Sequence, residues 1–312
     1  MKRFKSILYV TEENGDQNSA ITRAVSMAEN NQAGLTVIDV IPPVVDAHLS
    51  DTVNHHKQKL ELLIEPYRNR VKIQIDVLVG TVFLEVIRSV LRSEYDLVVK
   101  AVENTDFMKR LFGSVDMHLL RKCPCPIWLI KTPEKSKYNH VLAAVDFDFD
   151  SLQAVASEQA FNNEILDRAA AFALSDKAFL HLVHAWEAFA EKSMIAHGDI
   201  SSESVAAHVQ KQQLIHQKEL YRLGEALSDR IGTNAYNKLS PSFHLPKGPA
   251  KKLIAPLAAE LGVDLVVMGT VARTGISGLI IGNTAEAILD QLACSVLAIK
   301  PPGFKTPVKL DE

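Results

Sequence analysis

Four glycines lie close together in the stretch GTVARTGISGLIIGNTAE, which spans residues 269–286. The stretch follows the buried-strand pattern DLVVM and precedes AEAILDQLA, whose apolar residues have helical spacing. In open α/β sheets, ligands bind where the parallel strands end, and the first N–H groups of the next helix attract anions. Glycine also lets a phosphate approach the backbone closely. The residue types and their order therefore predict a loop that binds a phosphate or another anion.

The last of these glycines, Gly282, directly precedes the expected helix TAEAILDQL. The N–H groups of Asn283, Thr284 and Ala285 would then have no partner within the helix and would lie at its positive end. A second interpretation stays open, in which Asn283 caps the helix and Glu286, three residues later, completes a capping box.

Apolar strand-like runs alternate with helical patterns along the chain. Strands as apolar as these are typical of a parallel sheet that is covered by helices on both faces. The sequence therefore predicts an α/β fold. In the first part, strands are expected at 6–10, 34–41, 71–80, 96–100 and 126–131, and helices at 18–31, 51–70, 82–93 and 115–121.

The same order repeats after the polar segment TPEKSK at 132–137. Laid without a gap over 282–300, residues 113–131 have the same Gly, Leu, Cys, Ile and Lys at equivalent positions. Two copies of one α/β domain are therefore expected. The first copy has lost every glycine of the loop but the last. The predicted boundaries are 1–134 for the first domain, 138–303 for the second and 304–312 for a C-terminal tail.

These features together resemble the universal stress protein family, in its tandem two-domain form. The resemblance is carried by VLAAVD ending at Asp146, by VVMGT with GTVARTGIS, by GNTAE and by ILDQLACSVLAIK. It covers nearly the whole chain. It implies two tandem Rossmann-like domains of the adenine-nucleotide alpha hydrolase-like type. Each would be an open, five-stranded, mostly parallel sheet with helices on both faces, and the final strands would pair the two domains as a built-in dimer.

In that family, a loop of the form G-x-x-G, nine residues, then G-(S/T) binds ATP. Here Ala272 stands at the second glycine and Asn283 at the Ser/Thr position. The resemblance implies that Asp146 contacts the nucleotide and that the backbone near Val183 contacts adenine, although Asp146 could equally be a turn or cap acid. Arg273 either holds a phosphate or is solvated. The predicted ligand-binding residues are Asp146, Val183, Gly269, Thr270, Ala272, Arg273, Gly275, Gly282, Asn283 and Thr284, and the predicted cofactor is ATP or another nucleotide in the second domain.

The first copy departs from this pattern at the equivalent positions. Thr11 with Glu12 replaces the Asp, and further polar and acidic residues surround what remains of the loop. We therefore expect the first domain to bind no nucleotide. The residues around the degenerate loop are Ala101, Glu103, Asn104, Asp106 and Asp116.

Composition narrows the function further. The 312 residues carry a formal charge of −3 with acids and bases mixed along the chain, which disfavours a nucleic-acid partner. No run reaches the roughly 18 apolar residues of a membrane span, and the N-terminus does not fit a signal peptide, so a cytoplasmic location is expected. Cys123, Cys125 and Cys294 are interpreted as reduced core thiols, with a C-x-C redox pair as the alternative.

Eleven histidines invite a metal site, but no segment contains a strong ligand set, and no metal ligands are predicted. His181 and His184, three apart on a strand, should point to opposite faces. Adventitious metal binding that involves His118 and His244 stays open. The long segment 187–213 is either a lid over an apolar pocket or a packing surface between domains or in a dimer.

Common enzyme motifs are missing: the sequence has no GxxxxGK(S/T), no GxSxG and no HExxH. We therefore expect a non-enzymatic regulatory protein of the stress response, without catalytic residues, whose second domain binds a nucleotide-like or anionic, partly apolar small molecule. A weak ATPase or phosphotransfer enzyme and a carrier of a lipid-like ligand remain alternatives. An intramolecular pseudo-dimer of the two domains is expected, and a homodimer is also allowed.

Overall fold

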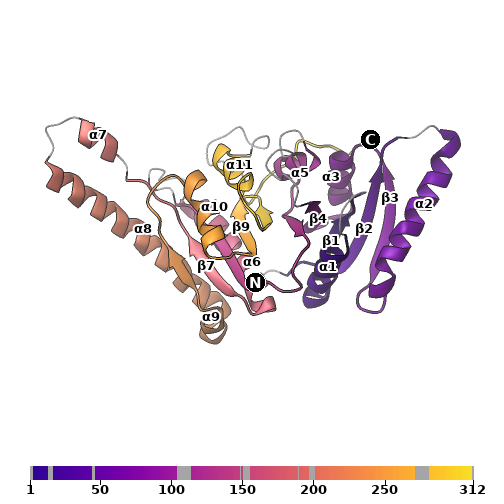
Figure 1. The fold of residues 1–312 in the computed structure, drawn as a ribbon, viewed down its shortest axis with the longest axis horizontal. Helices are drawn as coiled ribbons and strands as arrows, with labels where there is room; N and C mark the ends of the chain where they lie inside the picture. Colours follow the sequence, from indigo (N-terminus) through magenta and orange to yellow (C-terminus); the bar gives the residue numbers. More distant parts are fainter. Residues whose placement is uncertain are drawn as a thin grey trace. The chain divides into compact units, whose positions relative to one another are not determined.

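The computed structural model describes residues 3–12, 17–43, 46–103, 114–147, 149, 155–188, 190–196, 201–270 and 281–310 (Figure 1). The chain forms two compact units that do not coincide with its two sequence halves. The first unit comprises Lys2–Lys137, Gly269–Glu286 and Cys294–Glu312. The second unit comprises Tyr138–Met268 and Ala287–Ala293.

Six strands form the sheet of the first unit, in the order β3-β2-β1-β4-β5-β10. The first five are parallel, and β10 pairs antiparallel with β5, with Val296 opposite Leu129. Helix α2 lies against β2 and β3, whereas α1 lies against β1, β4 and β5 (Figure 1). The elements are β1 Ser6–Val10, α1 Gln17–Asn31, β2 Gly34–Ile41, α2 Asp46–Ile64, the 3-10 turn η1 Glu65–Tyr67, β3 Ile73–Val79, α3 Val82–Ser93, β4 Leu97–Glu103, α5 Val115–Lys122, β5 Ile127–Thr132 and β10 Ser295–Ile299.

Four parallel strands form the sheet of the second unit, in the order β9-β6-β7-β8. Helix α6 packs on β6 and β7. Gly224 of α8 faces the Phe243 ring, and a Cβ atom there would lie 2.5 Å from that ring, so glycine permits the close approach. The elements are β6 His140–Ala144, α6 Val155–Asp176, β7 Phe179–Val183, α7 Glu191–Ala196, α8 Ser202–Ile231, α9 Thr233–Leu239, β8 Ser242–His244, α10 Ala250–Glu260 and β9 Leu265–Gly269, followed by α11 Asn283–Leu289, which begins in the first unit.

The predicted class of two tandem α/β domains with mostly parallel open sheets is confirmed. The expected pairing of the final strands is confirmed as well, by β5 and β10. The helix expected at 51–70 differs, because α2 begins at Asp46 and gives way at Glu65 to a 3-10 turn that contains Pro66. Proline lacks the N–H that an α-helix needs at that position and disfavours helical geometry in the residue before it. The predicted domain boundaries stay a prediction.

The strand registers make residues of the two halves equivalent. Val10 of β1 pairs with Lys100 of β4, and Ala144 of β6 pairs with Met268 of β9. One residue further on, the Thr11 N–H donates to the Ile38 carbonyl at 2.9 Å, as the Val145 N–H donates to the Val183 carbonyl at 3.0 Å. It follows that Glu12 is the structural counterpart of Asp146, and Lys100 that of Met268.

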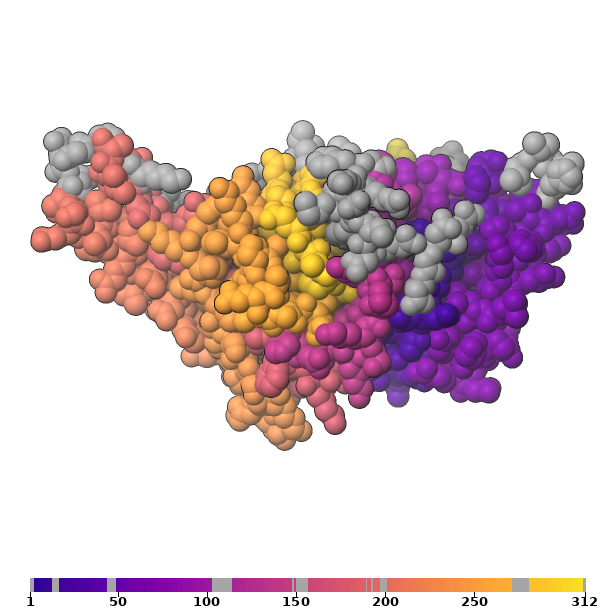
Figure 2. Space-filling view, viewed as in Figure 1, coloured from indigo at the N-terminus to yellow at the C-terminus, as the bar shows by residue number. Residues whose placement is uncertain are grey.

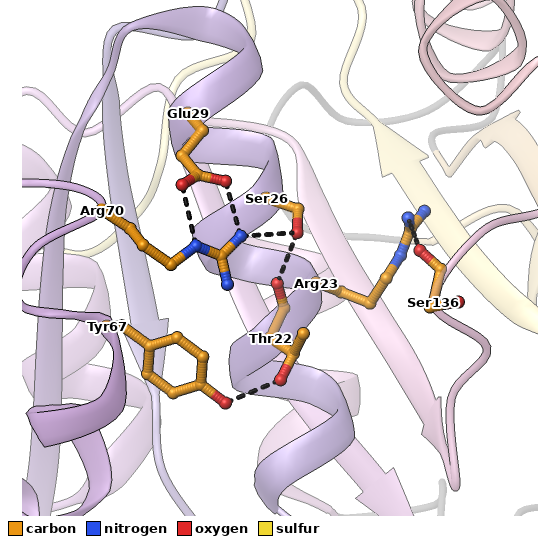
Figure 3. Close-up of polar contacts among 7 residues, drawn as sticks. All are labelled: Thr22, Arg23, Ser26, Glu29, Tyr67, Arg70 and Ser136. Carbon is orange, nitrogen blue, oxygen red and sulfur yellow. Dashed lines mark hydrogen bonds and ion pairs between the residues drawn. The ribbon is translucent and has the colours of Figure 1, made fainter.

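A polar network fixes α1 to the surrounding first unit (Figure 3). The Arg70 guanidinium binds both Glu29 carboxylate oxygens, at 2.8 and 2.6 Å, and the Thr22 and Tyr67 hydroxyls lie 2.7 Å apart. Arg23, 4% exposed, donates to the Ser136 carbonyl at 2.8 Å. The pairing with Arg70 lowers the pKa of Glu29. Because these groups satisfy one another, the network serves the fold.

The cysteines and α8 complete the description. Cys123 and Cys125 are buried, with their sulfur atoms 3.6 Å apart, and Cys294 is half-buried; none of the three is in a disulfide bond. Much of α8 lies at the surface (Figure 2), where Leu214 and Tyr221 are exposed. Within the described part of the chain, no helix is both long enough and apolar enough to cross a membrane.

Candidate functional site

The two ends of the glycine-rich loop lie together in the first unit. Thr270 is fully buried, and its N–H donates to the Ile299 carbonyl at 3.2 Å. The Gly282 N–H donates to the Thr270 carbonyl at 3.1 Å, which closes the base of the loop. Gly269 is the last residue of β9, as the loop prediction requires. Ala272, Arg273 and Gly275 lie outside the described residues.

Helix α11 begins directly after Gly282. Its first internal hydrogen bond runs from the Glu286 N–H to the Gly282 carbonyl at 2.9 Å, so the amides of Asn283 and Thr284 precede the helical ladder. Both residues are exposed. The Glu286 carboxylate lies 3.0 Å from the Arg121 guanidinium instead of returning to Asn283. The Glu286 N–H and carboxylate thus have partners other than Asn283, which argues against the capping box, and the anion site at the start of α11 stays a prediction.

Asp146 lies just beyond β6, at the carboxyl end of the second unit's sheet. Asn162 of α6 holds its backbone from both sides: the Asn162 amide donates to the Asp146 carbonyl at 2.7 Å and accepts from the Asp146 N–H at 3.2 Å. The Asp146 side chain is 69% exposed. The Val183 side chain is fully buried, and its carbonyl already accepts from Val145. Only the second lone pair of that carbonyl is left for a ligand.

A pair of buried imidazoles lies beside Asp146. His184 Nε2 and His216 Nδ1 are 2.8 Å apart, and His184 Nδ1 lies 3.4 Å from the Val145 carbonyl and 3.8 Å from the Asp146 carboxylate. Phe147 contacts the His184 ring edge-on, and Phe149 contacts His216 in the same way. Burial lowers the pKa of His216. The pair thus places two stacked, buried rings next to an exposed carboxylate.

The sequence did not reveal this pair, because His216 lies on α8, far along the chain from His184. The expected opposite orientation of His181 and His184 is confirmed. His181 belongs to a separate ladder across β6, β7 and β8, in which it lies 3.0 Å from His140 Nδ1 and 3.1 Å from His244 Nε2. Burial, with the neighbouring His244 and His140, lowers the pKa of His181 to about 4.

The equivalent place in the first half holds three charges. Lys100, 2% exposed, pairs with Glu12 and lies 2.8 Å from the Asp116 carboxylate on the first turn of α5. Ser114 caps that helix by accepting from the Met117 N–H at 3.2 Å. Two acids and a side-chain cap therefore lie at the ends of β1 and β4 and at the start of α5, and the expected loss of nucleotide binding in the first half stays a prediction.

The predicted site residues divide between the two units. Asp146 and Val183 belong to the second unit, whereas Gly269, Thr270 and 282–284 belong to the first. Within the second unit, Ala144 of β6 and Met268 of β9 are paired. Among the described residues, no group of three or more His, Cys, Asp or Glu side chains is arranged to hold a metal ion.

His118 and His244, considered above as adventitious metal ligands, each have another partner. His118 stacks on Phe83 with ring centroids 4.4 Å apart, and burial together with the charges of Lys122 and Arg121 lowers its pKa. His244 is part of the ladder through His181.

Known proteins share this architecture and sequence pattern. The model of the Universal stress protein family matches residues 3–131 and again 137–300. Universal stress protein E of Escherichia coli (strain K12) is 28% identical over 332 aligned positions, which cover 100% of this chain and 99% of that relative. The Universal stress protein E homolog of Haemophilus influenzae is 26% identical and covers 96% of this chain and 98% of that relative.

A crystal structure of a functionally unknown protein from Pseudomonas aeruginosa PAO1 superposes with a TM-score of 0.68 at 26% identity. The superposition covers 96% of this chain and 93% of that one. Both the sequence match and the fold therefore extend over the two halves. The chain belongs to the universal stress protein family and carries two tandem copies of its domain.

Proposed function

We propose that this chain is a non-enzymatic regulatory protein of the stress response, whose second half binds a nucleotide-like or other anionic, partly apolar ligand. The binding residues are Gly269 and the start of α11, with Asp146 at the end of β6. ATP or a related nucleotide is the leading candidate, and a cytoplasmic location stays part of the proposal.

One contrast carries the proposal. In the first half, Lys100 pairs with both Glu12 and Asp116 at the carboxyl ends of β1 and β4. At the equivalent places the second half has the uncharged Met268 and Ala285, and its Asp146 side chain is exposed. Only the second half thus retains the glycine sequence, and its helix start has Asn283 and Ala285 where the first half has the Ser114 cap and Asp116, an arrangement that favours an anion.

The surroundings of Asp146 support a ligand that is also partly apolar. Phe149 is 43% exposed and packs against His216, whose imidazole pairs with that of His184. Aromatic side chains of this kind offer a face for a planar ring or an apolar group. A carrier of a lipid-like molecule would use the same face.

Isothermal calorimetry with ATP and ADP on the full chain tests the proposal. Asn283→Asp adds a negative charge at the exposed start of α11 and should weaken phosphate binding at least about tenfold, because like charges repel. Gly282→Val should abolish binding by blocking close approach to the backbone. The matched control is Ser114→Asp, which places the same acid at the equivalent position of the first half and should leave affinity unchanged.

Unchanged affinity in Asn283→Asp would contradict the phosphate site. Native mass spectrometry of the purified protein separates the alternatives. A nucleotide mass without turnover supports the proposal, turnover of ATP supports an ATPase, and a lipid-like mass supports a carrier.

A further inference from the structure

A lysine at the end of the last strand holds the first residue of the binding loop. Lys300 follows β10 directly and is 7% exposed. Its Nζ atom donates to the Thr270 hydroxyl at 3.0 Å and to the Leu120 carbonyl, and it lies 3.5 Å from the Arg121 carbonyl. Leu120 and Arg121 belong to the last turn of α5, where carbonyls have no partner within the helix and attract a cation. Lys300 therefore joins the loop to the end of α5.

The same helix holds the other end of the loop. Arg121 of α5 pairs with Glu286, in the first turn of α11, at 3.0 Å, and the two side chains are 30% and 15% exposed. Between these two attachments, the Gly282 N–H closes the loop by donating to the Thr270 carbonyl. Both ends of the glycine-rich stretch are thus tied to each other and to one turn of one helix.

This helix comes from the other half of the sequence. Residues 3–131, which include α5, form the first copy of the domain, and residues 137–300 form the second. At its start, α5 carries Ser114 and Asp116, which fill the first copy's own site. At its end it binds Lys300, which holds Thr270, and it pairs with Glu286 of α11. The degenerate copy therefore supplies structural support to the retained one.

We propose that α5 of the first half positions the two described ends of the glycine-rich stretch, Thr270 and residues 282–286, with Arg121 and Lys300 as the positioning residues. Insofar as it concerns ligand affinity, this rests on the function proposed above. A ligand that must order its binding residues loses that ordering free energy from its affinity, whereas residues that are already held in place do not carry this cost. Thr270, Gly282 and Glu286 are held in this way. Burial makes the Lys300 contacts stronger than they would be in water.

Burial also lowers the pKa of Lys300 to about 8, against an opposing contribution from Cys123. The ammonium form is retained at neutral pH by two backbone carbonyls and the Thr270 hydroxyl. A phenyl face, that of Phe304, lies 4.8 Å from Nζ and covers the same cation. Through these contacts the buried ammonium group of Lys300 connects Thr270 to the end of α5.

Hydrogen exchange on the ligand-free full chain tests the positioning directly. Arg121→Ala and Lys300→Met should each speed exchange of the Gly282 and Glu286 amides by about tenfold, because local opening becomes easier. Matched controls are Lys131→Met, at the equivalent lysine of the first half, and Arg222→Ala, which removes an arginine from an ion pair on α8. Both controls should leave these two amides unchanged.

A charge swap distinguishes positioning from general destabilisation. Arg121→Glu alone should speed exchange, and Arg121→Glu combined with Glu286→Arg should restore slow exchange at Gly282. The proposal is overturned if neither single variant changes these amides, if exchange rises equally throughout β1 and β2, or if the swap fails to restore protection.

Calorimetry with ATP and ADP then connects positioning to binding. If the unmodified chain binds, both single variants should weaken binding about fivefold to twentyfold, in the range of typical coupling between sites. Equal affinities would overturn the link to ligand binding. If the unmodified chain binds neither nucleotide, the proposed function fails, whereas the exchange results still decide whether α5 positions the loop.

Discussion

The two halves of the chain place different side chains at equivalent positions of the same scaffold. Beside the strand ends, the first half has Glu12 and Lys100 where the second has Asp146 and Met268. In the first half the charges satisfy one another within the protein, whereas in the second the carboxylate is exposed. The difference shows that equivalent strand ends can hold either an internally paired group of charges or an exposed carboxylate while the strands stay in register.

A side-chain contact next to these positions is retained in both halves. The residue after Ile38 in the first half is Asp39, which binds His56 of α2 at 2.6 Å. Its counterpart in the second half is His184, which binds His216 of α8 at 2.8 Å. A contact between the end of the second strand and a later helix is therefore present in both halves with different chemistry, so the scaffold retains it even where the site residues differ.

The largest effect should come from removing the internal cation of the first half. Lys100→Met leaves Glu12 and Asp116 facing each other without their partner and should lower the free energy of unfolding by about 3 kcal/mol. Urea denaturation measures this change. Adding Glu12→Asp and Asp116→Ala, which installs the residues of the second half, should recover most of the loss. A single variant as stable as the unmodified chain would show that the three charges are not coupled.

The next largest effect should be on stability at low pH, where we expect the second half to be destabilised before the first. Because the folded pKa of His181 is about 4 and the ordinary value is 6.5, the unfolded chain takes up a proton first as the pH falls. The stability that neutral His181 contributes is thus complete above pH 6.5 and is lost as the pH falls from 6.5 toward 4. In the first half, the register places Thr36 at this position.

Thermal unfolding from pH 7 to 4 tests this expectation, with His181→Thr as the variant. The variant should show a flatter decline of midpoint with pH, although its stability at pH 7 will be lower. Hydrogen exchange should show β7 losing protection in acid before β2. An unchanged slope in the variant would assign the acid sensitivity to other groups, such as Glu260, which lies near His244.

The smallest effect concerns the loop that only the second half retains. Ala272 adds a methyl group where the family pattern has glycine, so Ala272→Gly should tighten ATP binding a few-fold, about 1 kcal/mol. Calorimetry measures the change. If the affinity stays the same, Asn283 or a different ligand explains the departure from the family pattern.

Much of this fold follows from local patterns in the sequence. Buried parallel strands are continuous apolar runs, which is why 6–10 and 34–41 coincide with β1 and β2. The repeat and the loop position were equally visible, because both depend on glycine and on strand–helix order. Helix ends were harder to predict. Helix α2 begins at Asp46, five residues before the expected 51, because residues 46–50 (DAHLS) show no helical spacing of apolar residues.

The side-chain partners of the site could not be predicted in the same way. Lys100 meets Glu12 and Asp116, and His184 meets His216, only because the sheet brings distant segments together. The spacing of apolar residues within one segment gives no information about such contacts. One signal was present: after the shared DLVV, the first copy has Lys100 and the second has Met268, and a lysine that ends a buried run needs an acidic partner.

The antiparallel pairing of β5 with β10 has a consequence for dividing the chain. Leu129 and Trp128 of β5 are fully buried, and β10 covers the hydrogen-bonding side of that strand. A fragment cut after the first copy would expose this apolar strand as an open edge, which readily joins another chain. The sequence repeat is thus not the unit that can be expressed alone. A first-half fragment that is to be expressed alone must also include β10, from the other end of the chain.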